Sequence, residues 1–264
     1  MNEQLELHPN FSYRVDVVGN EKEPVLIVDN FLNNPEMLIE YAKTNCEFNG
    51  NESGGYYPGV RAKGPDVYIK ALVKFLGPII LETFYGERIK AVRPASFFSM
   101  VVTPPEKLSP LQCIPHFDSS NYWDLATVHY LSQNKNSGTS LYRHRATGFE
   151  SVRLQRTEKY FTDVIKELEN LPSEKKYMNG SNENFEQIGS YDSEFNRIVI
   201  YRCTNLHSGN ISNNFNFDPD PNTGRLTLNT FLYTSKDATS GLSRHYLSTE
   251  SNGSKVITTE ANVM

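Results

Sequence analysis

Short runs of β-branched and aromatic residues dominate this sequence from about residue 91 onward. Gly, Pro, Asn or Ser residues bound each run, which is typical of strands separated by turns. The runs are 96–102, 127–131, 139–144, 197–202 and 226–233. One stretch, 157–171, departs from this series because its apolar residues recur at helical spacing and a proline follows. Since strands and helices do not alternate regularly, the order favours an antiparallel sandwich or barrel with helices outside.

The first 90 residues contain two strand patterns and two helix patterns. Residues 13–18 and 24–28 have the composition of short strands. A helix is expected to begin at Pro35, after an asparagine cap. A second helix should follow Asp66 and end where Pro78 interrupts it. The apolar faces of these two helices are expected to pack against a sheet.

We therefore predict one mainly β domain with flanking helices. Segment 1–90 would supply N-terminal strands and supporting helices, segment 91–235 the β core, and segment 236–264 a C-terminal tail. The stretch 177–194 and the tail after residue 235 are polar and rich in Gly, Ser or Asn, so we expect loops that add little to the core. No repeat of 20 to 50 residues is present, which argues against solenoids and propellers.

Composition excludes several classes of function. With 264 residues, of which 38% are hydrophobic, the chain can bury a core without metals or disulfides. The net charge of -5 gives no general attraction for nucleic acid or anionic membranes. No apolar run approaches the ~20 residues of a spanning helix, and the acidic N-terminus does not resemble a secretion signal. Three widely spaced cysteines suit free thiols, so we expect a cytoplasmic protein.

The segment Pro115-His116-Phe117-Asp118 carries the clearest chemical signal. On an extended chain, side chains two residues apart point the same way, so His116 and Asp118 converge while Phe117 packs on the other side. An imidazole and a carboxylate placed in this way supply two of the three ligands of a facial metal triad.

The third ligand follows a buried strand late in the chain. His207 comes just after the strand pattern 197–202, and an antiparallel barrel can bring it to the H-x-D pair. Beyond it, Arg225, Thr227 and Asn229 share one face of the next strand. A buried guanidinium needs a carboxylate partner, which a bound dicarboxylate would supply.

In these residues the chain resembles the iron(II)- and 2-oxoglutarate-dependent oxygenases, especially the prolyl-hydroxylase-like group. The resemblance covers about half of the chain, in the order 115–118, 129–132, 137–142, 197–209 and 225–233.

This resemblance implies a double-stranded β-helix, a jelly-roll or cupin-like barrel. His116, Asp118 and His207 would hold Fe(II), with 2-oxoglutarate as cosubstrate and O2 as oxidant. Arg225 would bind the distal carboxylate of 2-oxoglutarate, together with Thr227, Asn229 and the phenol of Tyr130. The resemblance thus assigns Thr227, Asn229 and Tyr130 as cosubstrate contacts.

The implied reaction hydroxylates an unactivated C–H bond and releases succinate and CO2. The substrate would be a small molecule or a peptide side chain, with no nucleic acid or membrane as partner. Because Asp118 retains the carboxylate that halogenating relatives lack, halogenation is disfavoured. Two alternatives remain: an inactive jelly-roll module that binds a sugar or small acid, and a metal-dependent hydrolase or cupin-type dioxygenase.

Other residues have a structural interpretation beside a functional one. Tyr142, His144 and Trp123 could contact substrate or pack in the core. We interpret His129 as a core histidine, because it should face away from its neighbour Tyr130. The pairs Cys113/His116 and Cys203/His207 could suggest structural zinc, although small buried cysteines are more common in cores.

Overall fold

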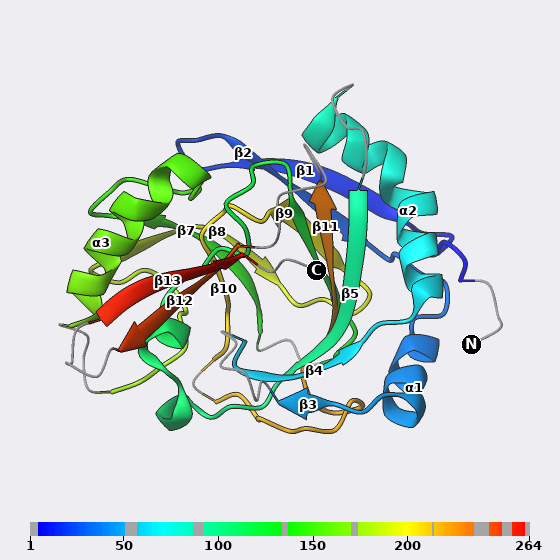
Figure 1. Cartoon of the computed structure of the whole chain (residues 1–264). Helices are drawn as coiled ribbons and strands as arrows, with labels where there is room; N and C mark the ends of the chain where they lie inside the picture. Colours follow the sequence, from blue (N-terminus) through cyan, green and yellow to red (C-terminus); the bar gives the residue numbers. More distant parts are fainter. Residues whose placement is uncertain are drawn as a thin grey trace.

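The computed structural model of the chain describes residues 5–50, 57–86, 92–133, 137–169, 174–212, 214–234, 243–249 and 255–261 (Figure 1). Two antiparallel sheets form its centre. The larger sheet contains, in spatial order, β1 (Ser12–Val18), β2 (Glu23–Asp29), β9 (Ile198–Arg202), β6 (Leu125–Tyr130), β11 (Leu226–Thr234), β5 (Val92–Val101), β4 (Gly59–Lys63) and β3 (Asn49–Gly50). The smaller sheet contains β10 (His207–Gly209), β7 (Gly138–His144) and β8 (Phe185–Asp192). A separate pair consists of β12 (Ser243–Thr249) and β13 (Lys255–Ala261).

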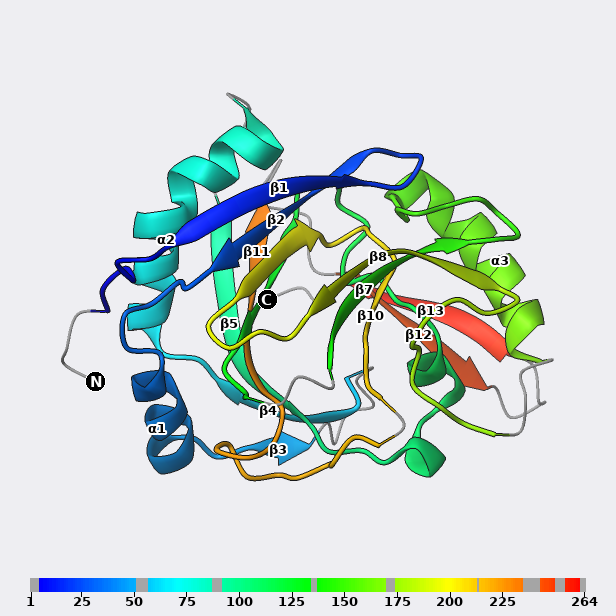
Figure 2. The ribbon, with the colours of Figure 1, turned by 180° about the vertical axis from the view of Figure 1, so that it is seen from behind.

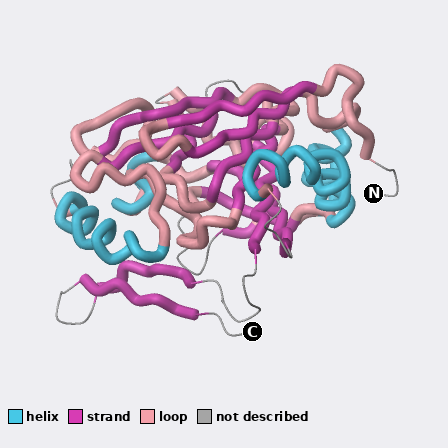
Figure 3. Tube along the Cα trace, turned by 90° about the horizontal axis from the view of Figure 1, so that it is seen from above, coloured by secondary structure: helices cyan, strands magenta, loops and turns pink. Residues whose placement is uncertain are grey.

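Helices lie on two opposite sides of the strands (Figure 3). The α-helices of the described residues are α1 (Glu36–Asn45), α2 (Asp66–Ile80) and α3 (Thr157–Leu168). Shorter helical turns occur at Leu81–Tyr85, Pro105–Lys107, Pro110–Cys113 and Leu154–Arg156. None of the helices among the described residues has the length and apolar character needed to cross a membrane.

The two central sheets pack face to face, which Figure 2 shows from behind. The apolar cluster between them combines Val128, Tyr130 and Val199 of the larger sheet with Leu141 and Tyr191 of the smaller one. Residues that alternate with these along the strands point outward, as expected for sheets covered on both faces. This arrangement is a double-stranded β-helix, as predicted.

Each sheet also has an outer core beneath helices. On the larger sheet, Leu226 and Leu228 of β11 pack with Leu72 and Leu76 of α2. On the smaller sheet, Tyr142 and Phe185 pack with Tyr160 and Val164 of α3. Such burial contributes about 1.5 to 3 kcal/mol for each large apolar side chain, so both helices are held by their apolar stripes.

The predicted elements agree closely with the structure. The strand patterns 96–102, 127–131, 139–144, 197–202 and 226–233 correspond to β5, β6, β7, β9 and β11, and 157–171 contains α3. The patterns 13–18 and 24–28 are β1 and β2, which extend the larger sheet rather than form a separate layer.

Three predictions about local structure are wrong. The stretch 177–194 is not a loop, because it contains β8, and Tyr177, Met178, Phe185 and Tyr191 within it are buried. The strand is polar overall because only alternate side chains reach a core. Helix α2 continues past Pro78, since proline removes only one backbone donor and a π-helical turn follows directly.

The tail after residue 235 was expected to be a loop, but β12 and β13 within it pair with each other. The rest of the tail, at 235–242, 250–254 and 262–264, lies outside the described residues.

Candidate metal centre

Backbone hydrogen bonds bring the two predicted histidine ligands together. The amide of His116 donates to the carbonyl of His207 at 2.9 Å, and the amide of His207 donates to the carbonyl of His116 at 2.8 Å. The amide of Asp118 donates to the carbonyl of Cys203 at 2.8 Å, which fixes the second half of the H-x-D segment. Three short contacts therefore bring together two segments that lie 85 to 91 positions apart in the sequence.

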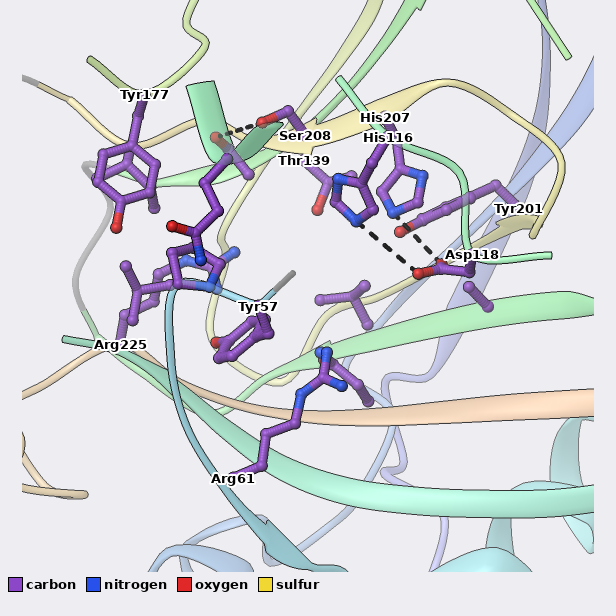
Figure 4. Close-up of a pocket in the computed structure, with 18 of the residues that line it drawn as sticks. Tyr57, Arg61, His116, Asp118, Thr139, Tyr177, Tyr201, His207, Ser208 and Arg225 are labelled. Atoms are coloured by element: carbon purple, nitrogen blue, oxygen red, sulfur yellow. Dashed lines mark hydrogen bonds and ion pairs between the residues drawn. The ribbon is translucent and has the colours of Figure 1, made fainter. Parts of the chain in front are cut away.

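The three side chains converge as the sequence predicted (Figure 4). The distance from His116 Nε2 to Asp118 Oδ1 is 3.8 Å, and that from His207 Nε2 to Asp118 Oδ2 is 3.4 Å. One potential ligand atom from each residue lies within 4.8 Å of the other two. Two imidazoles and one carboxylate at this spacing can bind one metal ion on a single face and leave its other positions open.

The protonation of the histidines suits metal binding. The Nδ1 of His207 lies 2.9 Å from the carbonyl oxygen of Asn205. A proton on Nδ1 would satisfy that carbonyl and leave Nε2 as a free donor atom. Desolvation, followed by the charges of His207 and Arg61, lowers the pKa of His116 well below its ordinary value. His116 is thus neutral near pH 7, the form that coordinates metals.

The triad opens into a pocket between the sheets, with a cavity of about 90 Å³. Tyr201 of β9 forms part of its wall, and its ring centroid lies 4.7 Å from that of His207. Apolar lining residues include Val101, Ile114, Ala126, Val128, Ile211 and Phe231. Polar side chains, among them Gln112, Thr127, Thr139 and Ser208, also line it.

Arg225 lies in the same pocket and is only 5% exposed. Its Nη2 donates to the carbonyl of Gly138 at 3.1 Å, and its guanidinium carbon lies 5.7 Å from the ring centroid of Tyr130. Its Nε has no hydrogen-bond partner. Among the described residues no carboxylate forms an ion pair with it, so a buried positive charge faces the pocket uncompensated.

Of the other residues predicted to bind cosubstrate, Tyr130 has a ring contact with Arg225 and Asn229 lines the pocket. The Tyr130 hydroxyl is 2.6 Å from Thr139 Oγ1, and Thr227 Oγ1 donates to the carbonyl of Ser99 at 3.3 Å. Asn229 lines the pocket and its Oδ1 has no partner. The amide nitrogen of Asn229 donates to Ser99 Oγ at 3.4 Å, so only its acceptor oxygen is available to a ligand. Tyr130 and Thr227 do not line the pocket, and their hydroxyls are engaged within the protein.

Tyr142, His144 and Trp123 do not line this pocket, so the structure does not support their predicted contact with substrate. Tyr142 and His144 face the core beneath α3, where His144 Nε2 lies 3.0 Å from both carboxylate oxygens of Glu167. The Trp123 ring stacks on Tyr85, 6.4 Å away between centroids.

The alternative of a zinc site with cysteine ligands finds no support among the described residues. The one metal-type cluster there contains the H-x-D pair and His207, without Cys113 or Cys203. The Cys113 thiol instead donates to the carbonyl of Ser109 at 3.5 Å, and Cys203 is fully buried.

His129 is a core residue, as predicted. It is fully buried, stacks on Tyr68 at 5.7 Å between ring centroids, and lies 3.1 Å from Asn196 Oδ1 through Nε2. Burial lowers the pKa of His129 to about 4.

Two pocket residues were not foreseen from the sequence. Arg61, on β4, and Tyr57, just before that strand, both line the pocket opposite the triad. The run Gly59-Val60-Arg61-Ala62-Lys63 has no clear strand signal, and its place beside β5 depends on pairing across the sheet.

Comparisons with known proteins give a family without a function. Residues 9–232 match the sequence profile described as "Family of unknown function (DUF6445)". No curated protein is significantly similar in sequence.

Some solved structures show a distant likeness. SnoK, a non-heme alpha ketoglutarate dependent carbocyclase from nogalamycin biosynthesis, has 12% identity and a TM-score of 0.46 over 82% of this chain and 81% of SnoK. HygX from Streptomyces hygroscopicus, with nickel and 2-oxoglutarate bound, has 8% identity and a TM-score of 0.44 over 88% of this chain and 90% of HygX. HygX with nickel, 2-oxoglutarate and hygromycin B bound has 8% identity and a TM-score of 0.40 over 92% of this chain and 89% of HygX. At these values the reactions of SnoK and HygX do not transfer to this chain.

Proposed function

We propose that this chain, which belongs to the DUF6445 family of unknown function, is an iron(II)- and 2-oxoglutarate-dependent oxygenase of the prolyl-hydroxylase-like group. It would hydroxylate an unactivated C–H bond of a small molecule or a peptide side chain. One observation carries the proposal: a His-Asp-His cluster and a buried guanidinium without a carboxylate partner face the same pocket.

The donor set of the cluster fits ferrous iron. Two imidazole nitrogens and one carboxylate oxygen form the ligand set of non-heme iron(II) oxygenases, whereas structural zinc sites prefer four protein ligands. His116, Asp118 and His207 supply three. Since no fourth His, Cys, Asp or Glu joins the cluster among the described residues, the set leaves room for exogenous ligands.

Arg225 fits the far end of a dicarboxylic cosubstrate. A guanidinium forms paired hydrogen bonds with a carboxylate, and a buried one that has no partner is costly. The Nε of Arg225 is the atom left without a partner. We infer that it donates to the distal carboxylate of 2-oxoglutarate, with the ring of Tyr130 beside it.

When bound, iron and 2-oxoglutarate would supply the oxidising power from O2, with succinate and CO2 as coproducts. The chain's own residues would bind and orient these two groups and would exclude water from the pocket. The triad fixes the ligand atoms on one side, Arg225 fixes the cosubstrate on the other, and the apolar wall formed by Val128 and Phe231 limits water in the pocket. Because Asp118 keeps its carboxylate, we favour hydroxylation over halogenation.

Anaerobic titration tests the proposal. Addition of Fe(II) and 2-oxoglutarate to the purified protein should produce a weak visible charge-transfer band. His207→Ala should abolish the band through loss of metal. Arg225→Gln should shift the midpoint of the titration to a much higher concentration of 2-oxoglutarate. Lys63→Gln, which removes a charge outside the pocket, serves as the matched control and should leave the band unchanged.

The outcomes separate the alternatives. A folded protein that gives no band and binds no metal would be a jelly-roll binding module. Metal-dependent turnover that is indifferent to 2-oxoglutarate and releases no succinate would indicate a hydrolase or a cupin-type dioxygenase. Either outcome contradicts the proposal.

A further inference from the structure

We propose that Arg61 forms a second anion-binding subsite in the pocket, which takes a carboxylate group of the primary substrate. This inference rests on the proposed function and narrows its substrate class to carboxylic acids. The site is distinct from that of Arg225, which the cosubstrate would occupy.

Arg61 points into the pocket from β4 (Figure 4). Its guanidinium carbon lies 4.3 Å from the ring centroid of Tyr57, a distance typical of a cation–π contact, which orients the group. Its Nε is buried and has no hydrogen-bond partner. No carboxylate among the described residues forms an ion pair with Arg61, so its charge is available to a ligand.

Tyr57 separates the two arginines. Figure 4 shows its ring between the guanidinium groups of Arg61 and Arg225. Burial raises the pKa of Tyr57, while the charges of Arg225 and Arg61 both lower it, so both groups lie within electrostatic reach of the phenol. One carboxylate held by Arg225 would therefore not also neutralise Arg61, because an aromatic ring stands between them.

Charge balance favours an anionic substrate. The described lining of the pocket contains two arginines and one aspartate. A divalent metal and a dicarboxylate compensate each other, and Asp118 compensates one arginine. One positive charge remains, which a single carboxylate on the substrate would neutralise. A neutral substrate would leave a guanidinium desolvated and unpaired, which is unfavourable.

Exposure assigns the two arginines to different ligands. Arg225 is almost fully buried and anchored to the carbonyl of Gly138 in the smaller sheet. Arg61 is only half-buried and comes from the opposite edge of the pocket. The deeper group suits a cosubstrate that binds first, and the more accessible group suits a substrate that enters afterwards.

The test measures binding rather than turnover. The protein is loaded under argon with Zn(II) in place of iron and with saturating 2-oxoglutarate. Propionate, benzoate and phenylacetate are then titrated by ligand-observed NMR, each against its neutral carboxamide. Affinity for 2-oxoglutarate is measured separately by calorimetry for every variant.

The parent protein should bind at least one carboxylate better than its carboxamide. Arg61→Gln should lower the affinity for that carboxylate about tenfold or more, because a hydrogen bond to a charged group is lost. The affinity for 2-oxoglutarate should stay unchanged. Arg61→Lys should restore part of the affinity, because it keeps the charge. The control Lys63→Gln removes a charge from the same strand outside the pocket and should change the affinity for neither the carboxylate nor 2-oxoglutarate.

Two results would overturn the subsite. One is the absence of any preference for carboxylate in the parent. The other is an equal loss of 2-oxoglutarate affinity in Arg61→Gln, which would mean that both arginines serve the cosubstrate. If the parent binds a carboxylate through Arg61 but binds no 2-oxoglutarate, the subsite stands and the proposed oxygenase does not.

Discussion

Replacement of Arg225 by methionine should make the protein without 2-oxoglutarate more stable while removing its affinity for 2-oxoglutarate. The prediction follows from the isolation of this side chain. Arg225 is 5% exposed, has one hydrogen bond, to Gly138, and forms no ion pair among the described residues. A site that holds an uncompensated charge for a ligand is less stable than the same site filled by an apolar group of similar length.

The magnitude follows from opposing contributions. Burial of one unpaired charge costs several kcal/mol. The hydrogen bond to Gly138 recovers about 1.5 to 3 kcal/mol, and the contact with the Tyr130 ring recovers about 1 to 2 kcal/mol. We therefore expect the free energy of unfolding of Arg225→Met to exceed that of the parent by about 1 kcal/mol, a rise in Tm of about 2 to 4 °C for a chain of this size.

The cosubstrate should reverse this order. At a concentration of one hundred times Kd, a ligand stabilises the folded state by about 2.7 kcal/mol. Loss of a buried charge partner weakens binding by about 2 to 5 kcal/mol, so the same concentration should leave Arg225→Met almost unaffected. The parent should then be the more stable of the two.

A second buried arginine provides the matched control. Arg202 is 4% exposed, pairs with Glu23 at 2.9 Å, and donates to the carbonyls of Tyr122 and Phe84. Arg202→Met leaves Glu23 with Arg153 as its remaining partner, at 3.0 Å, and removes the donor from two carbonyls, so it should destabilise the fold by about 2 to 3 kcal/mol. The two substitutions are chemically identical and differ in sign because only one of the arginines has a carboxylate within the protein.

Urea unfolding monitored by circular dichroism, with Zn(II) present and with or without 2-oxoglutarate, measures these differences. The reasoning is refuted if Arg225→Met is destabilised as strongly as Arg202→Met. It is also refuted if 2-oxoglutarate stabilises Arg225→Met as much as the parent, since the guanidinium would then have no part in binding.

Two further predictions concern histidines. His207→Ala should lose metal binding in anaerobic titrations while its far-ultraviolet circular dichroism stays that of the parent, because the core does not include the metal; retained metal affinity would remove His207 from the site. For His129, burial lowers the pKa in the folded state to about 4 from an ordinary value of 6.5. The unfolded chain therefore binds the proton first, so stability should be complete above about pH 6.5 and fall by up to about 3 kcal/mol as the pH decreases to 4. His129→Phe should show a flatter profile in urea unfolding at pH 7 and pH 5, and an unchanged slope would contradict this assignment.

The pairing of His116 with Asp118 was predictable because it depends on a local rule, whereas their approach to His207, 91 residues later, was expected from the barrel fold. The spacing of His116 and Asp118 places both side chains on one side of an extended segment, and the strand before His207 fixes where that residue emerges. Arg225 was predictable for a related reason, since a charged residue at the start of a buried strand requires a partner. Only the approach of His207 to the other two residues depends on the barrel topology.

Tyr142 and His144 show where such rules stop. Alternation correctly places them on one face of β7, but both faces of the smaller sheet are buried, one against the larger sheet and one beneath α3. The sequence of the strand alone does not distinguish these faces. A register shift between Leu141 and Tyr142 further separates the inward part of the strand from the outward part.

Arg61 was missed for a different reason. Its strand is short and neither strictly alternating nor rich in β-branched residues, and its position depends on pairing with Ser99 of β5, 38 residues later in the chain. Long-range pairing of this kind leaves no periodic signal in the sequence.

The topology also explains why the metal-type cluster and the anion-binding groups are separate. His207 begins a strand of the smaller sheet and His116 pairs with it, whereas Arg61 and Arg225 come from or precede strands of the larger sheet. The cavity between the sheets therefore has donor atoms for a cation on one wall and guanidinium groups on the other. A molecule with two acidic ends can span this gap, one end at the metal and one at an arginine. A substitution that shifts one sheet relative to the other should consequently weaken 2-oxoglutarate binding before it weakens metal binding, because the proposed cosubstrate would contact both walls.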